Sequence, residues 1–304
     1  MSGIGRTNLL LFIVPSLIWG STWYFIKWQL GSVDPLWSVI YRFSASSIIL
    51  FTWCLIRKEN LRFSIRNHFR MIQLGIFLFG FNYWFAYLAE QTLVSALIAI
   101  AFSSLVFFNI FFCRIFLGDQ LRMKVLIGAA FGFSGTLVLY YKELVSIDNI
   151  GNRTFGIAAA LCMTSVVLAS LGNVISAANQ RKCIPVLPSN AYGMLYGSIL
   201  MLCLALTMDI NPNFSRSYKY VFSLLYLVVF GSVIAFSSYL KLVGRIGADK
   251  AAYVLITIPV IAVIISIIFE EMTVNVLTFI GIGLILIGNC MILLTREGLG
   301  VKNN

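Results

Sequence analysis

Long apolar runs separated by short charged segments extend along almost the whole chain. A helix needs about 20 mostly apolar residues to cross the hydrocarbon core of a bilayer. Lipid offers no partner for exposed backbone groups, and the runs lack the alternation of barrel strands, so we expect each run to be a helix. The ten predicted spans are residues 8–26, 37–56, 71–89, 94–113, 125–141, 155–178, 191–208, 221–240, 251–269 and 274–294.

Basic residues predict the orientation of these spans. If the N-terminus lies inside, the inner segments carry 16 of the 22 Lys and Arg residues and the outer segments carry 5. Cytoplasmic segments of membrane proteins are enriched in Lys and Arg, so we expect both termini to be cytoplasmic and the protein to be a multi-pass protein of the cell (inner) membrane. An odd number of spans would abolish this bias.

Composition agrees with a membrane protein and excludes several other classes. The 304 residues are 60% hydrophobic and only 11% charged, and the mean hydropathy is +0.93. A soluble domain carries about 25% charged residues. An ordinary soluble enzyme, a disordered chain and a nucleic-acid binder are therefore excluded, although the net charge is +11.

The sequence offers no arrangement typical of an enzyme or a metalloprotein. Its six cysteines are scattered without a CxxC pair, and it has one histidine. We therefore predict no disulfide framework, no metal site and no cofactor. No GxxxxGK[ST] loop is present, which argues against ATP-driven pumping. No serine–histidine pair or pair of intramembrane aspartates suggests catalysis. We expect no catalytic residues and no enzyme activity.

Weak internal similarity predicts two repeats, in residues 1–145 and 146–304. Each half holds five spans, so halves that share a fold must have opposite orientations in the membrane. Such an inverted repeat encloses a central cavity that opens alternately to each side. Chance recurrence remains an alternative, since Gly and Tyr are common in membrane helices. Residues about 153 positions apart match: Gly128 with Gly281, Gly135 with Gly288, and Tyr87-Leu88 with Tyr239-Leu240.

An ordered series of residues extends this pattern over about residues 8–294. It comprises Trp19-Gly20-Ser21, Lys27, Pro35, Tyr41-Arg42-Phe43, Asn82, Tyr87-Leu88, Ser95-Ala96, Gly118-Asp119, Gly128, Gly135, Pro259, Glu271, Gly281 and Gly288. As a set, it resembles the drug/metabolite transporter superfamily, specifically its ten-helix EamA-type branch. The chain departs from that family at Asp119, where Glu is usual, and in span 94–113, which lacks the proline equivalent to Pro259.

This resemblance implies an all-α polytopic membrane protein with ten transmembrane helices in a five-plus-five inverted repeat. It also implies transport of a small organic solute, often an amino acid or related metabolite, with export the commoner direction. An importer or exchanger of a nucleotide-like or cofactor metabolite is an alternative, and a channel or lipid-moving protein is another. The expected partners are the solute and membrane lipid, without nucleic acid. Proton coupling, and a monomeric or homodimeric state, stay open.

Arg42 is the most informative residue in the sequence. A charge within a span costs about 2.5–3.5 kcal/mol on insertion scales. Arg42 lies about five residues into its span, roughly 8 Å deep, so we expect it to face the bundle interior. Arg42 then either holds a substrate carboxylate or closes an outer gate with Glu90, near Lys27. A fixed ion pair that locks two helices together is the structural alternative.

Polar and aromatic residues at mid-depth on several spans are predicted to line the solute pathway, because such groups in hydrocarbon seek each other or water. Each could instead be a helix-packing residue or part of an interfacial aromatic belt. Pro259 is predicted to kink its helix, either as a hinge or as a static bend. With Arg42, the predicted substrate-binding residues are Trp19, Ser21, Asn82, Tyr83, Tyr87, Ser103, Asn109, Asn173 and Tyr239, and the gating or coupling residues are Glu90, Lys27 and Pro259.

Overall fold

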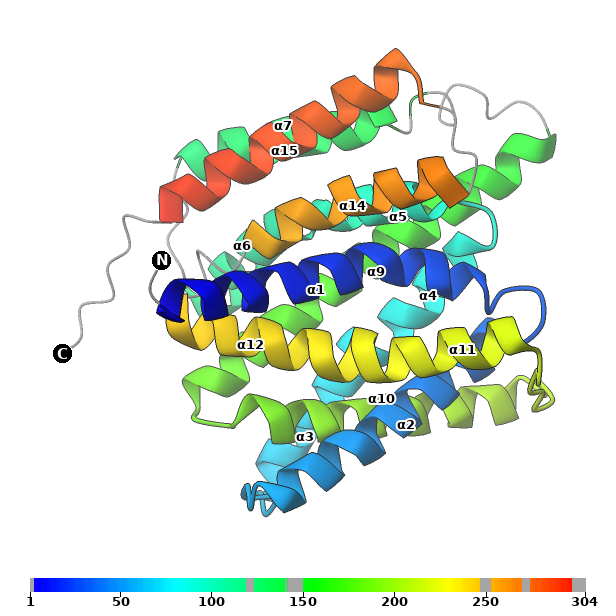
Figure 1. Ribbon diagram of the computed structural model, residues 1–304, viewed down its shortest axis with the longest axis vertical. Helices are drawn as coiled ribbons and strands as arrows, with labels where there is room; N and C mark the ends of the chain where they lie inside the picture. Colours follow the sequence, from blue (N-terminus) through cyan, green and yellow to red (C-terminus); the bar gives the residue numbers. More distant parts are fainter. Residues whose placement is uncertain are drawn as a thin grey trace.

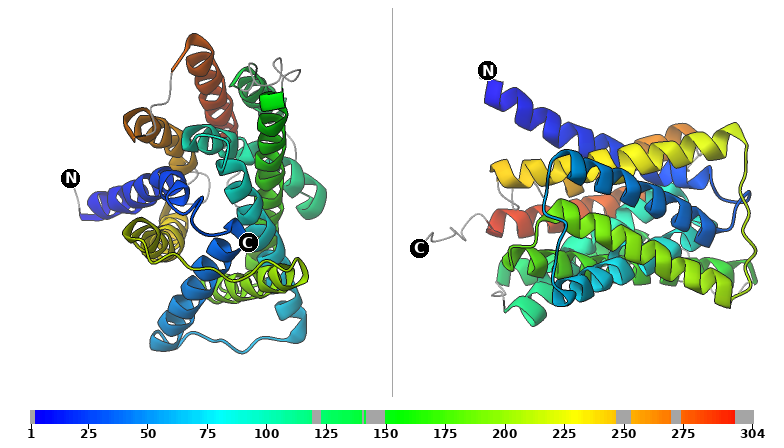
Figure 2. Two further views of the ribbon diagram at one scale, coloured as in Figure 1. Left: turned by 90° about the vertical axis from the view of Figure 1, so that its right-hand side faces the viewer. Right: turned by 90° about the horizontal axis from the view of Figure 1, so that it is seen from below.

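The computed structural model describes residues 3–118, 123–139, 141, 150–246, 253–269 and 274–296. All regular secondary structure in these ranges is helical, so the all-α fold class is confirmed. The helices pack side by side as a bundle of long rods (Figures 1 and 2). The start of α1 and the end of α15 lie at the same end of this bundle (Figure 1).

Consecutive elements of the first half form long helices. Three of them, α3, the π-helix η1 and α4, follow one another without a break, and only Ser104 separates α5 from α6. The elements are α1 (Gly3–Lys27), α2 (Pro35–Ile56), α3 (Ile65–Leu74), η1 (Gly75–Phe81), α4 (Asn82–Glu90), α5 (Ser95–Ser103), α6 (Leu105–Leu117) and α7 (Met123–Leu139).

The second half has the same kind of elements. A second π-helix, η2, joins α11 to α12 without a break. The elements are α9 (Ile150–Arg181), α10 (Val186–Thr207), α11 (Tyr218–Tyr226), η2 (Leu227–Ile234), α12 (Ala235–Ile246), α14 (Tyr253–Phe269) and α15 (Val276–Arg296).

Seven helices in the described ranges are long and apolar enough to cross a membrane. Three further apolar helices, Leu126–Leu139, Thr257–Phe269 and Val276–Gly288, are shorter. They coincide with the predicted spans 125–141, 251–269 and 274–294, so the count of ten spans stays a prediction. The seven candidates are Leu9–Lys27, Pro35–Ile56, Ile65–Glu90, Ser95–Leu117, Arg153–Arg181, Val186–Thr207 and Tyr218–Tyr239.

Local sequence signals define several helix ends. Asp34 caps α2 by accepting a hydrogen bond from the Leu36 backbone N–H at 2.8 Å, and Pro35 occupies the first turn, where its missing N–H costs nothing. Ser64 caps α3 in the same way, through the N–H of Asn67. Gly118 ends α6 in the left-handed conformation (φ 75°), which glycine adopts without strain.

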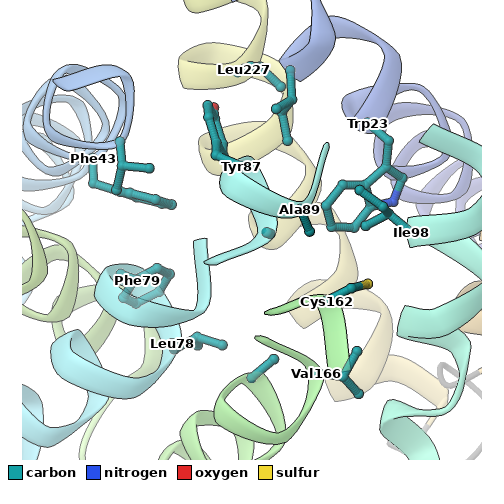
Figure 3. Close-up of a cluster of buried hydrophobic side chains, with 14 of the residues drawn as sticks. Trp23, Phe43, Leu78, Phe79, Tyr87, Ala89, Ile98, Cys162, Val166 and Leu227 are labelled. Atoms are coloured by element: carbon teal, nitrogen blue, oxygen red, sulfur yellow. The ribbon is translucent and has the colours of Figure 1, made fainter. Parts of the chain in front are cut away.

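A buried apolar cluster contains side chains from both halves of the chain (Figure 3). Trp23 of α1, Phe43 of α2 and Phe79 of η1 contribute from the first half, and Val166 of α9 and Leu227 of η2 from the second. Large apolar side chains are also exposed on the outer faces of many helices, among them Ile48, Leu55, Phe111, Leu206 and Leu225. Such an exterior suits contact with lipid chains rather than with water.

Glycines bring α7 and α15 into close contact at one edge of the bundle (Figure 1). A Cβ on Gly135 would lie 2.7 Å from the carbonyl oxygen of Gly281. A Cβ on Gly288 would meet the carbonyl oxygen of Gly128 and would lie 2.7 Å from the backbone nitrogen of Gly132. Close approach of backbones at small residues is a principal means of helix association in lipid.

Gly288→Ala is expected to destabilise the protein, because the new methyl group meets backbone atoms that cannot turn aside. Overpacking of this kind costs about 1–3 kcal/mol. The matched control is Gly283→Ala on the same helix, where nothing lies within 4 Å of the added Cβ. That variant should be neutral or stabilising, since Ala is favoured over Gly in a helix by about 0.5–1 kcal/mol. Thermal unfolding in detergent checks both, and equal behaviour of the two variants would contradict the packing.

Candidate functional site

Arg42 lies inside the bundle and is only 1% exposed. Its Nε donates a hydrogen bond to Ser232 Oγ at 3.2 Å, and its Nη1 donates to the Tyr87 hydroxyl at 3.4 Å. The guanidinium carbon lies 4.7 Å from the centre of the Tyr83 ring and 5.3 Å from that of Phe43. The prediction that Arg42 faces the bundle interior is confirmed, and its described contacts are with neutral groups.

The hydrogen bonds continue from Tyr87 to Gln29. The Tyr87 hydroxyl donates to Gln29 Oε1 at 3.0 Å, and both side chains are fully buried. Gln29 lies in the turn that follows α1. Its amide nitrogen, Nε2, is buried and has no hydrogen-bond partner in the part of the chain that the structure describes. A chain of polar groups therefore runs from Ser232 through Arg42 and Tyr87 to Gln29, and we call these four residues the Arg42 cluster.

Helix α1 meets the same part of the second half. Trp19 Nε1 donates to the carbonyl oxygen of Gly231 at 3.1 Å, and Ser21 Oγ lies 2.7 Å from the Tyr226 hydroxyl. A Cβ on Gly231 would lie 3.3 Å from Arg42 Nη2, so glycine leaves room for the guanidinium there. Trp19 and Arg42, from different helices, thus converge on adjacent residues of η2.

The two π-helices occupy corresponding positions in the two halves. η1 begins at Gly75 and η2 begins at Leu227, 152 positions later. This offset is close to the offset of about 153 that aligns the glycines of the predicted repeats. π-Helices are rare and frequently lie at functional sites, and η2 supplies two of the groups that contact Trp19 and Arg42.

Several predicted site residues are brought together around this region. Tyr83 and Tyr87 contact Arg42, and Trp19 and Ser21 contact η2 and α11. The ring of Tyr239 lies 5.4 Å from that of Trp19 in a tilted arrangement. Two groups of predicted residues are therefore in contact, Trp19 with Tyr239, and Tyr83 and Tyr87 with Arg42, while their binding of a solute stays a prediction.

Other predicted residues have their described contacts elsewhere. Asn82 Nδ2 donates to the carbonyl oxygen of Leu78 at 2.9 Å, and Ser165 Oγ of α9 lies 2.8 Å from both the carbonyl oxygen and Oδ1 of Asn82. Ser103 Oγ donates to the carbonyl oxygen of Ile100 in its own helix at 2.6 Å. These contacts tie helices together or satisfy a hydroxyl locally, and solute binding by Asn82 and Ser103 stays a prediction.

Asn109 and Asn173 are half-buried on α6 and α9. Oδ1 of Asn109 is buried and has no hydrogen-bond partner within the described ranges. Neither residue contacts the Arg42 cluster through a described hydrogen bond, so their role in binding also stays a prediction.

The contribution of the contact between Asn82 and Ser165 to the stability of the protein can be tested by mutation. Ser165→Ala is expected to lower stability by about 1–3 kcal/mol, because buried acceptors of Asn82 lose their donor. Thr164→Ala is the matched control: its exposed hydroxyl donates only within α9, to the carbonyl oxygen of Ala160 at 2.8 Å. Thermal unfolding should separate the two variants, and an unchanged midpoint for Ser165→Ala would contradict this account of the contact.

The predicted gating residues lie in three different settings. Glu90 is 1% exposed at the end of α4, and its Oε1 accepts a hydrogen bond from Ser95 Oγ at 2.8 Å. Lys27 is half-buried at the end of α1. Pro259 is buried within α14. Close to Pro259, a Cβ on Gly20 of α1 would lie 2.6 Å from Ile261 Cγ2, so α1 and α14 approach each other closely at Gly20.

A segment between α10 and α11 covers the start of α2, at the outer end predicted for that span. Trp37 Nε1 donates to the carbonyl oxygen of Ile210 at 3.1 Å, and the Tyr41 hydroxyl donates to that of Asn213 at 3.1 Å. The Asp34 backbone N–H donates to Asn213 Oδ1 at 3.4 Å. These contacts fix the segment against the first turns of α2.

Sequence reasoning missed Gln29, Gly231, Ser232 and Tyr226. Gln29 follows Lys27 by two residues in a short polar segment, which is a weak signal for a buried group. Ser232 stands in an apolar run and pairs with a residue 190 positions away. No local pattern indicates such a pairing.

Known proteins match the chain over most of its length. The EamA-like transporter family matches twice, over residues 6–141 and 156–294. The chain belongs to the EamA-like transporter family. The family resemblance inferred from the ordered residues is therefore confirmed, and it identifies a membrane transporter.

Two relatives and one solved structure illustrate the likeness. The uncharacterized transporter YoaV of Bacillus subtilis is 24% identical over 88% of this chain and 91% of its own length. The uncharacterized inner membrane transporter YedA of Escherichia coli K12 is 25% identical over 92% of this chain and 88% of its own. A crystal structure superposes with a TM-score of 0.67 at 18% identity, covering 97% of this chain and 99% of that one, which shows a shared fold.

Proposed function

We propose that this EamA-like transporter is a secondary transporter that moves a small organic metabolite, an amino acid or related solute, by alternating access, with export the commoner direction in the family. The observation that carries the proposal is the Arg42 cluster. A cation is costly within a membrane and usually marks a substrate or ion pathway. Here it connects α2 and α4 of the first half with η2 of the second, where two moving halves would share a site.

The same proposal divides the chain into two inverted repeats, residues 1–145 and 146–304, with five spans each. The two family matches and the corresponding positions of η1 and η2 support this division. Packing of α7 on α15 supports it as well. Under the offset of 153 positions, Gly135 corresponds to Gly288, and Gly281 corresponds to Gly128. The contact between Gly135 and Gly281 therefore has a counterpart between Gly288 and Gly128, and both contacts are present. Such pairing is the expected result of a pseudo-two-fold axis.

The proposed location is the cell (inner) membrane, with both termini cytoplasmic. The start of α1 and the end of α15 lie at the same end of the bundle, as an even number of crossings requires (Figure 1). The bias of 16 basic residues to 5 favours that end as the cytoplasmic one.

Counterflow in proteoliposomes tests the transporter proposal. Vesicles that contain the purified protein are loaded with a bacterial metabolite extract, and the solutes that leave in a protein-dependent way are identified by mass spectrometry. We expect saturable flux and accelerated exchange when the same solute is present on the other side. Flux that rises without saturation would indicate a channel, and the absence of any protein-dependent flux would contradict transport of a soluble metabolite.

Proton coupling through Glu90 is the proposed drive. Buried carboxylates in membrane spans serve as proton relays in many transporters. Glu90→Gln is expected to flatten the dependence of transport on pH between about pH 5 and pH 8, while Glu59→Gln, at an exposed site between α2 and α3, leaves it unchanged. An unaltered pH profile for Glu90→Gln would remove Glu90 from the mechanism.

A further inference from the structure

Arg42 carries a buried positive charge that its described contacts do not neutralise. Its two hydrogen bonds in the described part of the chain go to the hydroxyls of Ser232 and Tyr87. The buried carboxylate of Glu90 accepts a hydrogen bond from Ser95 and receives neither of the two from Arg42. Burying a cation whose described hydrogen bonds reach only neutral hydroxyls is costly, which is expected of a residue kept for binding rather than for stability.

The cluster also contains a hydrogen-bond donor without a described acceptor. A guanidinium has five N–H donors, and the described hydrogen bonds of Arg42 use Nε and Nη1. Nε2 of Gln29 is buried and has no hydrogen-bond partner among the described residues. The Tyr87 hydroxyl contacts both side chains, so these donors belong to one small region. A buried cation and a buried donor without a described acceptor therefore lie on either side of the Tyr87 hydroxyl, an arrangement that suits an anionic acceptor.

We propose that the Arg42 cluster binds the carboxylate group of the transported solute, with Arg42 as the charged partner and Gln29 Nε2 as an additional donor. This inference rests on the proposed transport function and names the chemical class of its substrate. Arginine matches a carboxylate through paired N–H groups. One buried cation balances the single charge of a carboxylate, whereas a phosphate ester carries about 1.5 to 2 negative charges at neutral pH.

The surroundings of Arg42 fit this role. The Tyr83 and Phe43 rings flank the guanidinium and restrict its orientation, while their faces tolerate a cation. Gly231 removes a side chain that would crowd Nη2. The Tyr87 hydroxyl fixes Arg42 and Gln29 relative to each other, so Tyr87 acts as a positioning residue for the two donors.

The extract-loaded proteoliposomes provide the first test. Every solute whose efflux depends on the wild-type protein is expected to carry a carboxylate. The primary amide of each such solute, which has a similar shape without the acidic group, should exchange about 10- to 100-fold less well, the loss expected for a charge-assisted hydrogen bond.

Variants assign the effect to the cluster. Arg42→Gln should abolish exchange of the carboxylate solute, Arg42→Lys should restore part of it, and Gln29→Leu should raise the half-saturating concentration about tenfold. The control Arg57→Gln changes the same residue type at the C-cap of the same helix. Arg57 also stacks on an aromatic ring, that of Trp53 at 5.0 Å, but it is exposed. The Arg57→Gln variant should transport the solute like the wild type.

The outcomes separate the two proposals. Protein-dependent transport of a neutral or cationic solute that survives in Arg42→Gln would overturn the carboxylate site and leave the transporter function standing. Exclusive transport of phosphate esters would overturn the assignment to a carboxylate in the same way. Absence of flux for every solute in the extract would instead refute the transporter function on which the carboxylate site rests.

Discussion

Replacing Arg42 with methionine is expected to abolish transport while the unfolding temperature stays equal to that of the wild type or rises. Exchange of buried ionic groups for apolar ones of similar volume is often neutral or stabilising by about 1–4 kcal/mol. The guanidinium of Arg42 is buried, and its described hydrogen-bond partners are two neutral hydroxyl groups, so its burial is expected to lower stability. A residue retained at a cost to stability is expected to be needed for function.

Thermal unfolding in detergent and solute exchange in proteoliposomes, measured on the same preparation, test this prediction. Arg57→Met is the control, because Arg57 is exposed at the end of the same helix. A fall of several degrees for Arg42→Met would support the structural alternative, in which Arg42 holds helices together. Unchanged exchange in a well-folded Arg42→Met protein would remove Arg42 from the site.

A leucine at Gly75 is expected to prevent the protein from folding. A Cβ at this position would lie 2.6 Å from the carbonyl oxygen of Gly193 and 2.8 Å from the backbone nitrogen of Gly197. Both atoms belong to the backbone of α10, so no side-chain rotation relieves the contact. A leucine adds three more carbons, and the cost should reach or exceed the upper end of the about 1–3 kcal/mol typical of overpacking.

The yield of monodisperse protein after size-exclusion chromatography measures the effect of Gly75→Leu. Gly156→Leu is the matched control, because nothing lies within 4 Å of a Cβ added to Gly156 in α9. We expect near-normal yield for Gly156→Leu and almost none for Gly75→Leu. Equal yields would show that η1 and α10 separate easily and that their close contact is unimportant.

The helical elements are largely predictable from hydropathy, but some of their ends are not. Predicted span 37–56 agrees closely with α2 (Pro35–Ile56). Predicted span 71–89 begins late, because the helix starts at Ile65 with a polar, basic turn that Ser64 caps. Hydropathy detects the part of a helix that suits hydrocarbon, whereas capping and helix propensity determine where the helix begins.

Residues of the candidate site are predictable only where a pattern within a single span indicates them. Arg42 is an isolated charge within an apolar run, and Tyr83 and Tyr87 share one face of their helix through i, i+4 spacing. Ser232 and Gln29 join them through tertiary contacts that local patterns do not encode. The π-helical form of η1 and η2 is also absent from hydropathy, since their residues form the same apolar runs as the adjoining α-helices.

Accessibility of Ser232 tests the central claim most directly, namely that the Arg42 cluster faces water from each side of the membrane in turn. Ser232→Cys is introduced after replacement of the six native cysteines. A membrane-impermeant thiol reagent is then applied to right-side-out and to inside-out vesicles. A variant that keeps only Cys183, which is exposed between α9 and α10, serves as the control and should react from one side alone.

We predict that the cysteine at position 232 reacts from both sides and that a transported carboxylate solute slows both reactions. A folded protein in which this cysteine reacts from neither side would contradict the account.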